Sequence, residues 1–176
     1  MKTTVNSRQV LSRFHVFELL SENITLSNGV TTDIQYLLHP GAAAIIPFVE
    51  PDRIIMIRQY RHAVGGFIWE IPAGTRNPEE TTLACAQREL VEETGFSAET
   101  WHPLGTITPV PAYSDERIDI FMATDLSPAS QNLDADEVLD VHQVPFSEAL
   151  DMVNQGKIQD AKTISSLFFA DQWLKR

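Results

Sequence analysis

Apolar residues fall into short runs along the chain, and turn-forming residues separate these runs. Four runs share this pattern: Ala42–Val49, Ile54–Ile57, Phe67–Ile71 and Ile118–Met122. Mainly apolar runs of this length indicate strands, and the first two read as buried strands. The pair Pro51-Asp52 predicts a turn between the first two strands, and Pro72 with Gly74 ends the third. The middle of the chain is therefore predicted to form a buried sheet.

A helix is predicted over residues 78–94, shortly after the third of these strands. Asn77 can cap its first turn, Pro78 suits the first helical position, and Glu80 stands three residues after the cap. Gly95 fits the C-terminal stop, because glycine readily adopts the left-handed conformation that ends many helices.

The last part of the chain is predicted to contain a polar loop over 127–137, a strand over 138–144 and helices over 146–154 and 163–175. Gln155-Gly156 separates the two helices. Four apolar residues of the last helix are expected in the core: Ile164, Leu167, Phe168 and Leu174. A sheet flanked by helices, with the elements in mixed order, indicates an α/β (α+β) sandwich.

Residues 1–40 show a different pattern, with short strands and turns. Asn28-Gly29 lies between the apolar runs 24–26 and 34–38, and Asn-Gly in this setting is the strongest short signal for a β-hairpin. We predict a small β extension over 1–40, which packs on the body of the protein or on a second subunit. Residues 41–176 are predicted to form the main domain.

Composition and charge restrict the class of partner. The formal net charge of −11 argues against binding to nucleic acid, since phosphate-backbone binding needs a basic surface. Cys85 is the single cysteine, so no internal disulfide can form, which suits a reducing cytoplasm. The N-terminus lacks the apolar core of a secretory signal, and no apolar run approaches the ~20 residues that cross a membrane. We expect a soluble cytoplasmic protein.

Three glutamates share one face of the predicted helix 78–94. Glu89, Glu92 and Glu93 stand at i, i+3 and i+4, a spacing at which like charges repel. Taken alone, such a run usually indicates a solvated helix surface. A divalent cation would turn the repulsion into binding, and Mg²⁺ takes carboxylate, water and phosphate oxygens. Arg88 stands four residues before Glu92 and can pair with it.

The longer pattern around these glutamates resembles the signature of the Nudix hydrolase family. The matching positions are Gly74, Glu80, Arg88-Glu89-Leu90, Glu92-Glu93, Gly95 and Phe96, with no departure in spacing. The resemblance implies an α/β/α sandwich with a mixed sheet. It also implies a hydrolase that depends on Mg²⁺, with Mn²⁺ as the alternative ion.

The same resemblance implies roles for the residues of the signature. Glu89 and Glu93 would be the main metal ligands, Glu92 a third or water-mediated ligand, and Ala73 a ligand through its backbone carbonyl. Four other residues would hold the shape of the motif: Gly74, Glu80, Arg88 and Gly95.

Segments outside the signature resemble the ADP-ribose pyrophosphatase branch of the family. They are Arg58–Arg61, Trp69–Gly74 and Pro111, which stands sixteen residues after Gly95 as a proline does in that branch. This implies hydrolysis of ADP-ribose to AMP and ribose 5-phosphate. A pyrophosphatase acting on GDP-mannose or another nucleotide sugar is the alternative within the family. A catalytically silent sensor of nucleotide sugars is the alternative from another class.

The branch also implies residues that contact the substrate or move protons. Arg61 is expected to contact the phosphates, and Arg58, in the same segment, is a second candidate for substrate binding. Glu137 matches the general base proposed for this branch and joins Glu92 and Glu93 as a catalytic candidate. Asp134 and Asp136 are its rivals. Members of this branch often build the substrate site across two subunits, which implies a homodimer.

Overall fold

The computed structural model describes residues 2–176, which divide into two compact units. The smaller unit runs up to Gly41 and also includes Thr108–Arg117. The larger unit contains Ala42–Ile107 and Ile118–Arg176. Each unit has its own sheet, and we describe each in turn.

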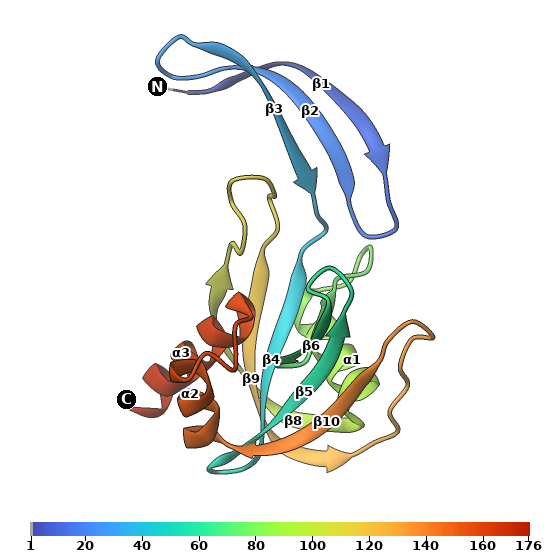
Figure 1. The fold of residues 1–176 in the computed structure, drawn as a ribbon, viewed down its shortest axis with the longest axis vertical. Helices are drawn as coiled ribbons and strands as arrows, with labels where there is room; N and C mark the ends of the chain where they lie inside the picture. The colour runs from blue at the N-terminus through green and yellow to red at the C-terminus, as the bar shows by residue number, and fades with distance from the viewer. Residues whose placement is uncertain (1) are drawn as a thin grey trace. The chain divides into compact units, whose positions relative to one another are not determined.

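The larger unit is built on a mixed seven-stranded sheet (Figure 1). Its strands are β4 (Ala42–Glu50), β5 (Arg53–Arg61), β6 (Gly66–Glu70), β7 (Ala73–Thr75), β8 (Phe96–Ile107), β9 (Ile118–Pro128) and β10 (Leu139–Pro145). The main path runs β10-β5-β4-β9-β8, while β6 pairs with β5 and β7 pairs with β4. The β4–β9 pair is parallel, whereas the other neighbours are antiparallel.

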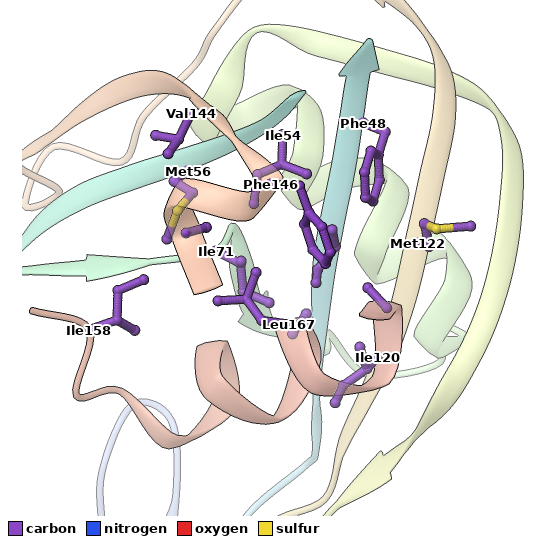
Figure 2. Packing of buried hydrophobic residues seen from close by; sticks show 14 of the residues in the cluster. Phe48, Ile54, Met56, Ile71, Ile120, Met122, Val144, Phe146, Ile158 and Leu167 are labelled. Carbon is purple, nitrogen blue, oxygen red and sulfur yellow. The ribbon is translucent and has the colours of Figure 1, made fainter. Parts of the chain in front are cut away.

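The central strand β4 is buried on both faces because helices cover each side of the sheet. Ala42, Ala44 and Ile46 belong to the cluster that contains residues of α2 (Phe146–Asn154) and α3 (Ala161–Leu174). Figure 2 shows Phe48 of β4 in this cluster together with Phe146 of α2 and Leu167 of α3. The alternate residues of β4 instead join Cys85, Ala86 and Leu90 of α1 (Thr82–Thr94). This arrangement of three layers confirms the predicted α/β/α sandwich.

Two details of the larger unit differ from the sequence prediction. Phe168 and Leu174 were expected in the core, but they are 59 % and 46 % exposed. They lie on the outer side of α3, while Leu167 is buried. Strand β8 was not predicted because its sequence contains Pro103 and Gly105, which are rare in regular strands. The β8–β9 register shifts between these two residues, so an irregularity accommodates them.

The smaller unit is an antiparallel sheet in the order β1-β2-β3. Its strands are β1 (Thr4–Arg13), β2 (Glu18–Thr25) and β3 (Thr31–Leu38). The predicted Asn28-Gly29 hairpin is present, and Gly29 has the positive φ of 88° that favours glycine in this turn. Among the helices of residues 2–176, none is long and apolar enough to cross a membrane.

Candidate active site

Helix α1 begins later than the sequence suggested. Thr81 is the N-cap, and its side-chain oxygen accepts a hydrogen bond from the backbone N–H of Ala84 at 3.1 Å. The predicted cap at Asn77 is wrong, because Glu79 adopts a positive φ of 64° that a helix cannot contain. Glu80 instead closes a tight turn by accepting a hydrogen bond from the backbone N–H of Asn77 at 2.9 Å.

The end of α1 agrees with the prediction. Gly95 has a left-handed backbone with φ of 72°, and its N–H donates to the carbonyl of Val91 at 2.9 Å. A glycine at this position ends the helix without steric cost. Glu89, Glu92 and Glu93 therefore lie in the last two turns of a helix with defined ends.

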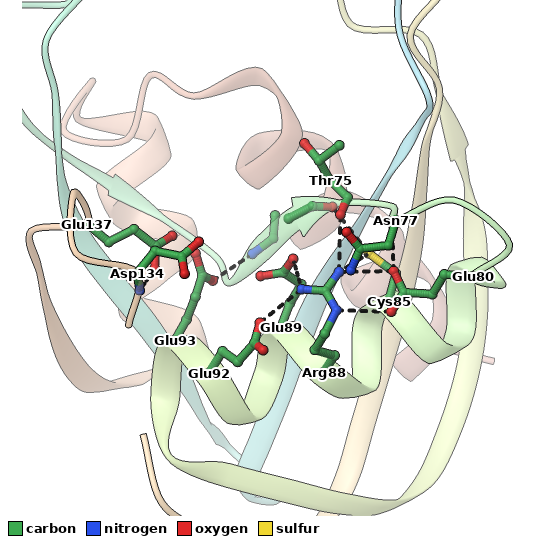
Figure 3. Close-up of polar contacts among 12 residues, drawn as sticks. Thr75, Asn77, Glu80, Cys85, Arg88, Glu89, Glu92, Glu93, Asp134 and Glu137 are labelled. Carbon is green, nitrogen blue, oxygen red and sulfur yellow. Dashed lines mark hydrogen bonds and ion pairs between the residues drawn. The ribbon is translucent and has the colours of Figure 1, made fainter. Parts of the chain in front are cut away.

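Arg88 joins the separate parts of the motif, as Figure 3 shows. Its guanidinium donates to both carboxylate oxygens of Glu80, at 2.9 and 3.0 Å, and to the carbonyl of Thr75 at 3.1 Å. The Nη1 group also donates to the carboxylates of Glu89 and Glu92. The hydrogen bond to Glu80 is the largest contribution raising the pKa of Arg88, so the guanidinium stays charged. These contacts suit the structural role predicted for Arg88 and Glu80.

Gly74 is required by the position of Glu89. A Cβ atom added at Gly74 would lie 1.9 Å from the carboxylate carbon of Glu89, where no real contact is possible. The absent side chain therefore leaves the space in which the Glu89 carboxylate lies. The backbone of Gly74 also contacts α1, because its carbonyl accepts a weak hydrogen bond from the Sγ–H of Cys85 at 3.4 Å.

Cys85 itself has a packing role. Its side chain is buried in the cluster between α1 and the sheet. Burial, together with the nearby charge of Glu89, raises the pKa of the thiol to about 12. A thiol that stays protonated is a poor metal ligand and a poor nucleophile.

Glu93 is the most deeply buried carboxylate of α1, with only 1 % of its surface exposed. One oxygen accepts a hydrogen bond from the backbone N–H of Ala73 at 2.9 Å. Burial raises the pKa of Glu93 well above its ordinary value, and the charge of Glu89 adds to this effect. Burial likewise raises the pKa of Glu89, although Arg88 partly opposes the shift. Two buried carboxylates thus have less positive charge around them than their ionised forms need.

This donor set fits a hard divalent cation. Glu89, Glu92, Glu93 and the Ala73 carbonyl are all oxygen donors, which Mg²⁺ and Mn²⁺ prefer. Within residues 2–176, no three His, Cys, Asp or Glu side chains are grouped closely enough to hold an ion by themselves. Mg²⁺ does not require such a cage, because it keeps several waters and takes substrate phosphate oxygens as ligands.

The loop before β10 docks against the C-terminal end of α1. The backbone N–H of Asn132 donates to the Glu92 carbonyl at 3.0 Å, and the Gln131 side chain donates to the Glu93 carbonyl at 2.7 Å. Glu137 ends this loop, and its charge contributes to the raised pKa of both Glu89 and Glu93. Its carboxylate accepts a hydrogen bond from the backbone N–H of Asp134 at 3.0 Å.

The structure places Arg61 and Arg58 in different surroundings. Arg61 donates two hydrogen bonds to the carboxylate of Glu70, at 2.9 and 2.7 Å. The guanidinium of Arg58 instead lies 5.4 Å from the centre of the Phe67 ring. Alternation along β5 directs the two arginines to opposite faces of the sheet. Substrate binding by either arginine stays a prediction.

Sequence reasoning missed Glu70 and Lys162. Glu70 is buried, and its carboxylate binds both Arg61 and the Lys162 ammonium, at 2.6 Å from the latter. A charged residue inside the apolar run Phe67–Ile71 was a usable signal, because an ionised side chain is rarely buried without a partner. The partner itself lies 92 positions away, and no local pattern indicates it.

Pro111 belongs to the smaller unit, in the segment Thr108–Arg117. This segment is attached to β3: the Leu37 N–H donates to the Tyr113 carbonyl at 2.9 Å, and the Asp115 side chain accepts from the His39 N–H at 2.9 Å. The proline thus lies in a loop that is hydrogen-bonded to the end of the N-terminal sheet.

Comparison with known proteins identifies relatives along nearly the whole chain. A family described as NUDIX domain matches residues 38–167. An ADP-ribose pyrophosphatase of Bacillus subtilis (strain 168) is 34 % identical over 162 residues, covering 91 % of this chain and 87 % of that protein. A methanol dehydrogenase activator of Bacillus methanolicus is also 34 % identical, covering 92 % and 88 %.

A solved structure and a further relative add to this picture. The crystal structure of an ADP compounds hydrolase matches with a TM-score of 0.87 and 29 % identity, covering 99 % of this chain and 95 % of that chain. A GDP-mannose pyrophosphatase of Cronobacter sakazakii (strain ATCC BAA-894) is 31 % identical, covering 84 % of this chain and 88 % of that protein.

Proposed function

The chain belongs to the Nudix hydrolase family, and from that premise we propose that it hydrolyses the diphosphate linkage of ADP-ribose. The products would be AMP and ribose 5-phosphate. The observation that supports hydrolysis most strongly is the complete carboxylate set on α1, in which Glu89 and Glu93 are buried with raised pKa values. The substrate is inferred from relatives that are named ADP-ribose pyrophosphatase.

Glu89, Glu92, Glu93 and the Ala73 carbonyl would hold Mg²⁺, with Mn²⁺ as the alternative. When bound, the metal supplies positive charge to the phosphates and activates water. Arg88 orients Glu89 and Glu92 through its Nη1 group, while the Ala73 N–H fixes one oxygen of Glu93. The chain therefore holds its ligand carboxylates in place by hydrogen bonds.

Glu137 is our candidate for the general base. Its loop is attached to the end of α1, and its charge acts on Glu89 and Glu93, which supports a position near the metal ligands. In this role its carboxylate accepts the proton of the attacking water. The Glu137→Gln variant should then lose roughly 10²–10⁴-fold in kcat. Normal turnover in that variant would transfer the role to Asp134 or Asp136.

The choice of substrate is tested by a panel of nucleotide sugars with Mg²⁺, read out as released phosphomonoester. We expect ADP-ribose to give the highest kcat/KM. A higher value for GDP-mannose would favour the alternative that the GDP-mannose pyrophosphatase relative supports. If no member of the panel were hydrolysed, the remaining alternative would be a silent sensor that only binds such compounds.

We also propose that the protein is a homodimer that associates through the N-terminal extension. The smaller unit exposes several apolar side chains, among them Val5, Leu11 and Phe14, and such side chains are candidates for a subunit interface. Sizing chromatography should give a species near twice the chain mass of 19.7 kDa. A species of the single-chain mass would contradict the dimer.

The cytoplasmic location remains a prediction from the single cysteine.

A further inference from the structure

Glu70, at the end of β6, is a buried carboxylate that two cations share. Its side chain is only 2 % exposed. One oxygen accepts from Arg61 Nε at 2.9 Å, and the other accepts from Arg61 Nη2 at 2.7 Å and from Lys162 Nζ at 2.6 Å. Both carboxylate oxygens are therefore occupied, and the two cations meet at one of them.

Lys162 is held firmly at the start of α3. Asp160 caps this helix by accepting from the Thr163 N–H at 3.0 Å, and it also accepts from Lys162 Nζ at 3.0 Å. The hydroxyl of Thr163 accepts a hydrogen bond from the backbone N–H of Ile71 at 3.0 Å. The first turn of α3 is thus bonded to the chain directly after Glu70.

Arg61 presents the free part of its guanidinium to solvent. Its side chain is 40 % exposed, and Nη1 makes no hydrogen bond to any other residue of the described range 2–176. The guanidinium also lies within electrostatic reach of the Glu93 carboxylate of α1, whose charge acts on Arg61. Glu70 therefore determines which way these unused donors point.

The charges of this cluster balance only when Lys162 is present. Arg61 and Lys162 supply two positive charges, and Glu70 and Asp160 supply two negative ones. Without the ammonium group the cluster would carry a net negative charge, which opposes the approach of a phosphate. Glu70 would also lose its second anchor and could rotate together with Arg61.

We propose that Lys162 is a positioning residue, which acts through the shared Glu70 carboxylate to hold Arg61 in the orientation that meets a diphosphate. The proposal rests on the proposed function and on the expectation, from the family resemblance, that Arg61 contacts the substrate phosphates. It assigns to the C-terminal helix α3 a part in substrate binding that its position outside the Nudix signature does not suggest.

Steady-state kinetics with ADP-ribose and saturating Mg²⁺ provide the first test. Lys162→Met should raise KM about tenfold with kcat within about threefold, because a contact made equally in the ground and transition states changes KM alone. Lys162→Arg should restore most of the loss. Lys157→Met is the matched control, since Lys157 is an exposed lysine in the turn after α2. Lys162→Gln serves as a second neutral variant if the Met variant folds poorly.

A double-mutant cycle separates positioning from general stability. In the Arg61→Ala background, Lys162→Met should change KM by less than twofold, because its effect passes through Arg61. Additive losses in the two backgrounds would overturn the proposal. A tenfold fall in kcat with no change in KM for Lys162→Met would overturn it as well.

A measurement without substrate distinguishes failure of this proposal from failure of the proposed function. The Nε–H of Arg61 should give a slowly exchanging ¹⁵N-edited NMR signal, and Lys162→Met should speed up its exchange by tenfold or more. An unchanged signal would overturn the positioning role. If the wild type hydrolysed no nucleotide sugar, only the proposed function would fail, and the NMR comparison would still decide whether Lys162 orders Arg61.

Discussion

Glu70 and Glu93 are both buried glutamates of the larger unit, yet their charges are balanced very differently. Burial alone would raise the pKa of Glu70, but Arg61 and Lys162 outweigh burial and hold the pKa below its ordinary value. Burial is the main cause that raises the pKa of Glu93, and the like charge of Glu89 adds to it, whereas the hydrogen bond from the Ala73 N–H opposes the shift without cancelling it. The protein thus pairs Glu70 directly with two of its own cations, whereas Glu93 has no such pair and would take an external cation in the proposed function.

This difference separates two kinds of polar cluster that look alike in a sequence. A carboxylate whose charge is fully paired supports neighbouring groups, as Glu70 does for Arg61. A buried carboxylate without a cation partner lowers the stability of the fold. Such a residue is found at functional sites, where a bound ligand or ion supplies the missing charge. The same substitution, Glu to Gln, should therefore have opposite consequences at the two positions.

The largest expected effect is on turnover in Glu93→Gln. The amide oxygen can still accept the Ala73 N–H, so the fold is kept while a charge of the proposed metal site is lost. We expect kcat to fall about 10³-fold at saturating Mg²⁺, which corresponds to about 4 kcal/mol of transition-state stabilisation. The control is the melting temperature in EDTA, which should be unchanged or higher than in the wild type. Turnover within a few-fold of the wild type would refute the ligand role.

Glu70→Gln should lower the stability of the fold, whereas Glu93→Gln should leave it unchanged or raise it. Removing one partner of a buried ion pair leaves Arg61 and Lys162 undercompensated, and we expect a loss of about 3 kcal/mol in urea denaturation. An equal stability of Glu70→Gln and Glu93→Gln would remove the distinction between the two clusters.

The pH dependence of the free energy of unfolding tests the direction of each pKa shift independently of turnover. For Glu70 the folded pKa is depressed, so its stabilisation is present above the ordinary glutamate pKa of about 4.3 and is lost as pH falls through the lower folded value. For Glu93 the folded pKa is raised, so the folded state binds the extra proton. Its contribution to stability falls as pH rises from about 4.3 towards the raised value. In EDTA, Glu93→Gln should flatten the curve in that second range, and Glu70→Gln should flatten it at the acidic end.

Substitution of Gly74 tests whether the position of Glu89 matters as much as its charge. A Cβ at Gly74 would overlap the Glu89 carboxylate, so Gly74→Ala should displace it and reduce kcat/KM about 10²-fold. The matched control is Gly66→Ala, because a Cβ at Gly66 meets no atom within 4 Å. Comparable activity in the two variants would show that Glu89 can move without consequence.

Much of the fold and the shared carboxylate face of α1 could be predicted from the sequence, because both depend on local spacing. Two such features can be read directly from the sequence. They are the apolar runs of β4 and β5 and the spacing of the Nudix signature. The partners of Glu70 could not be predicted, since Lys162 reaches it only through the packing of α3. Strand β8 was not predicted because Pro103 and Gly105 are residues typical of loops.

The start of α1 shows how local rules can compete. Asn77-Pro78 followed by Glu80 satisfies the pattern of a capped helix, but Glu80 is bound to Arg88, and the backbone at Glu79 turns into a left-handed conformation. The contact between Glu80 and Arg88 links positions eight apart, beyond the reach of a capping rule. The chain thus forms a turn at residues 77–80, and the helix begins after Thr81.

The smallest expected effect tests this helix start directly. Thr81→Ala removes the acceptor for the Ala84 N–H, and loss of an N-cap typically costs about 1 kcal/mol. Asn77→Ala should cost far less, because Asn77 uses its backbone groups in the turn with Glu80. Urea denaturation of both variants gives the comparison. A larger loss in Asn77→Ala than in Thr81→Ala would mean that the helix begins at Pro78 after all, and that the carboxylates of α1 lie on a longer, more rigid helix than the turn at Glu79 allows.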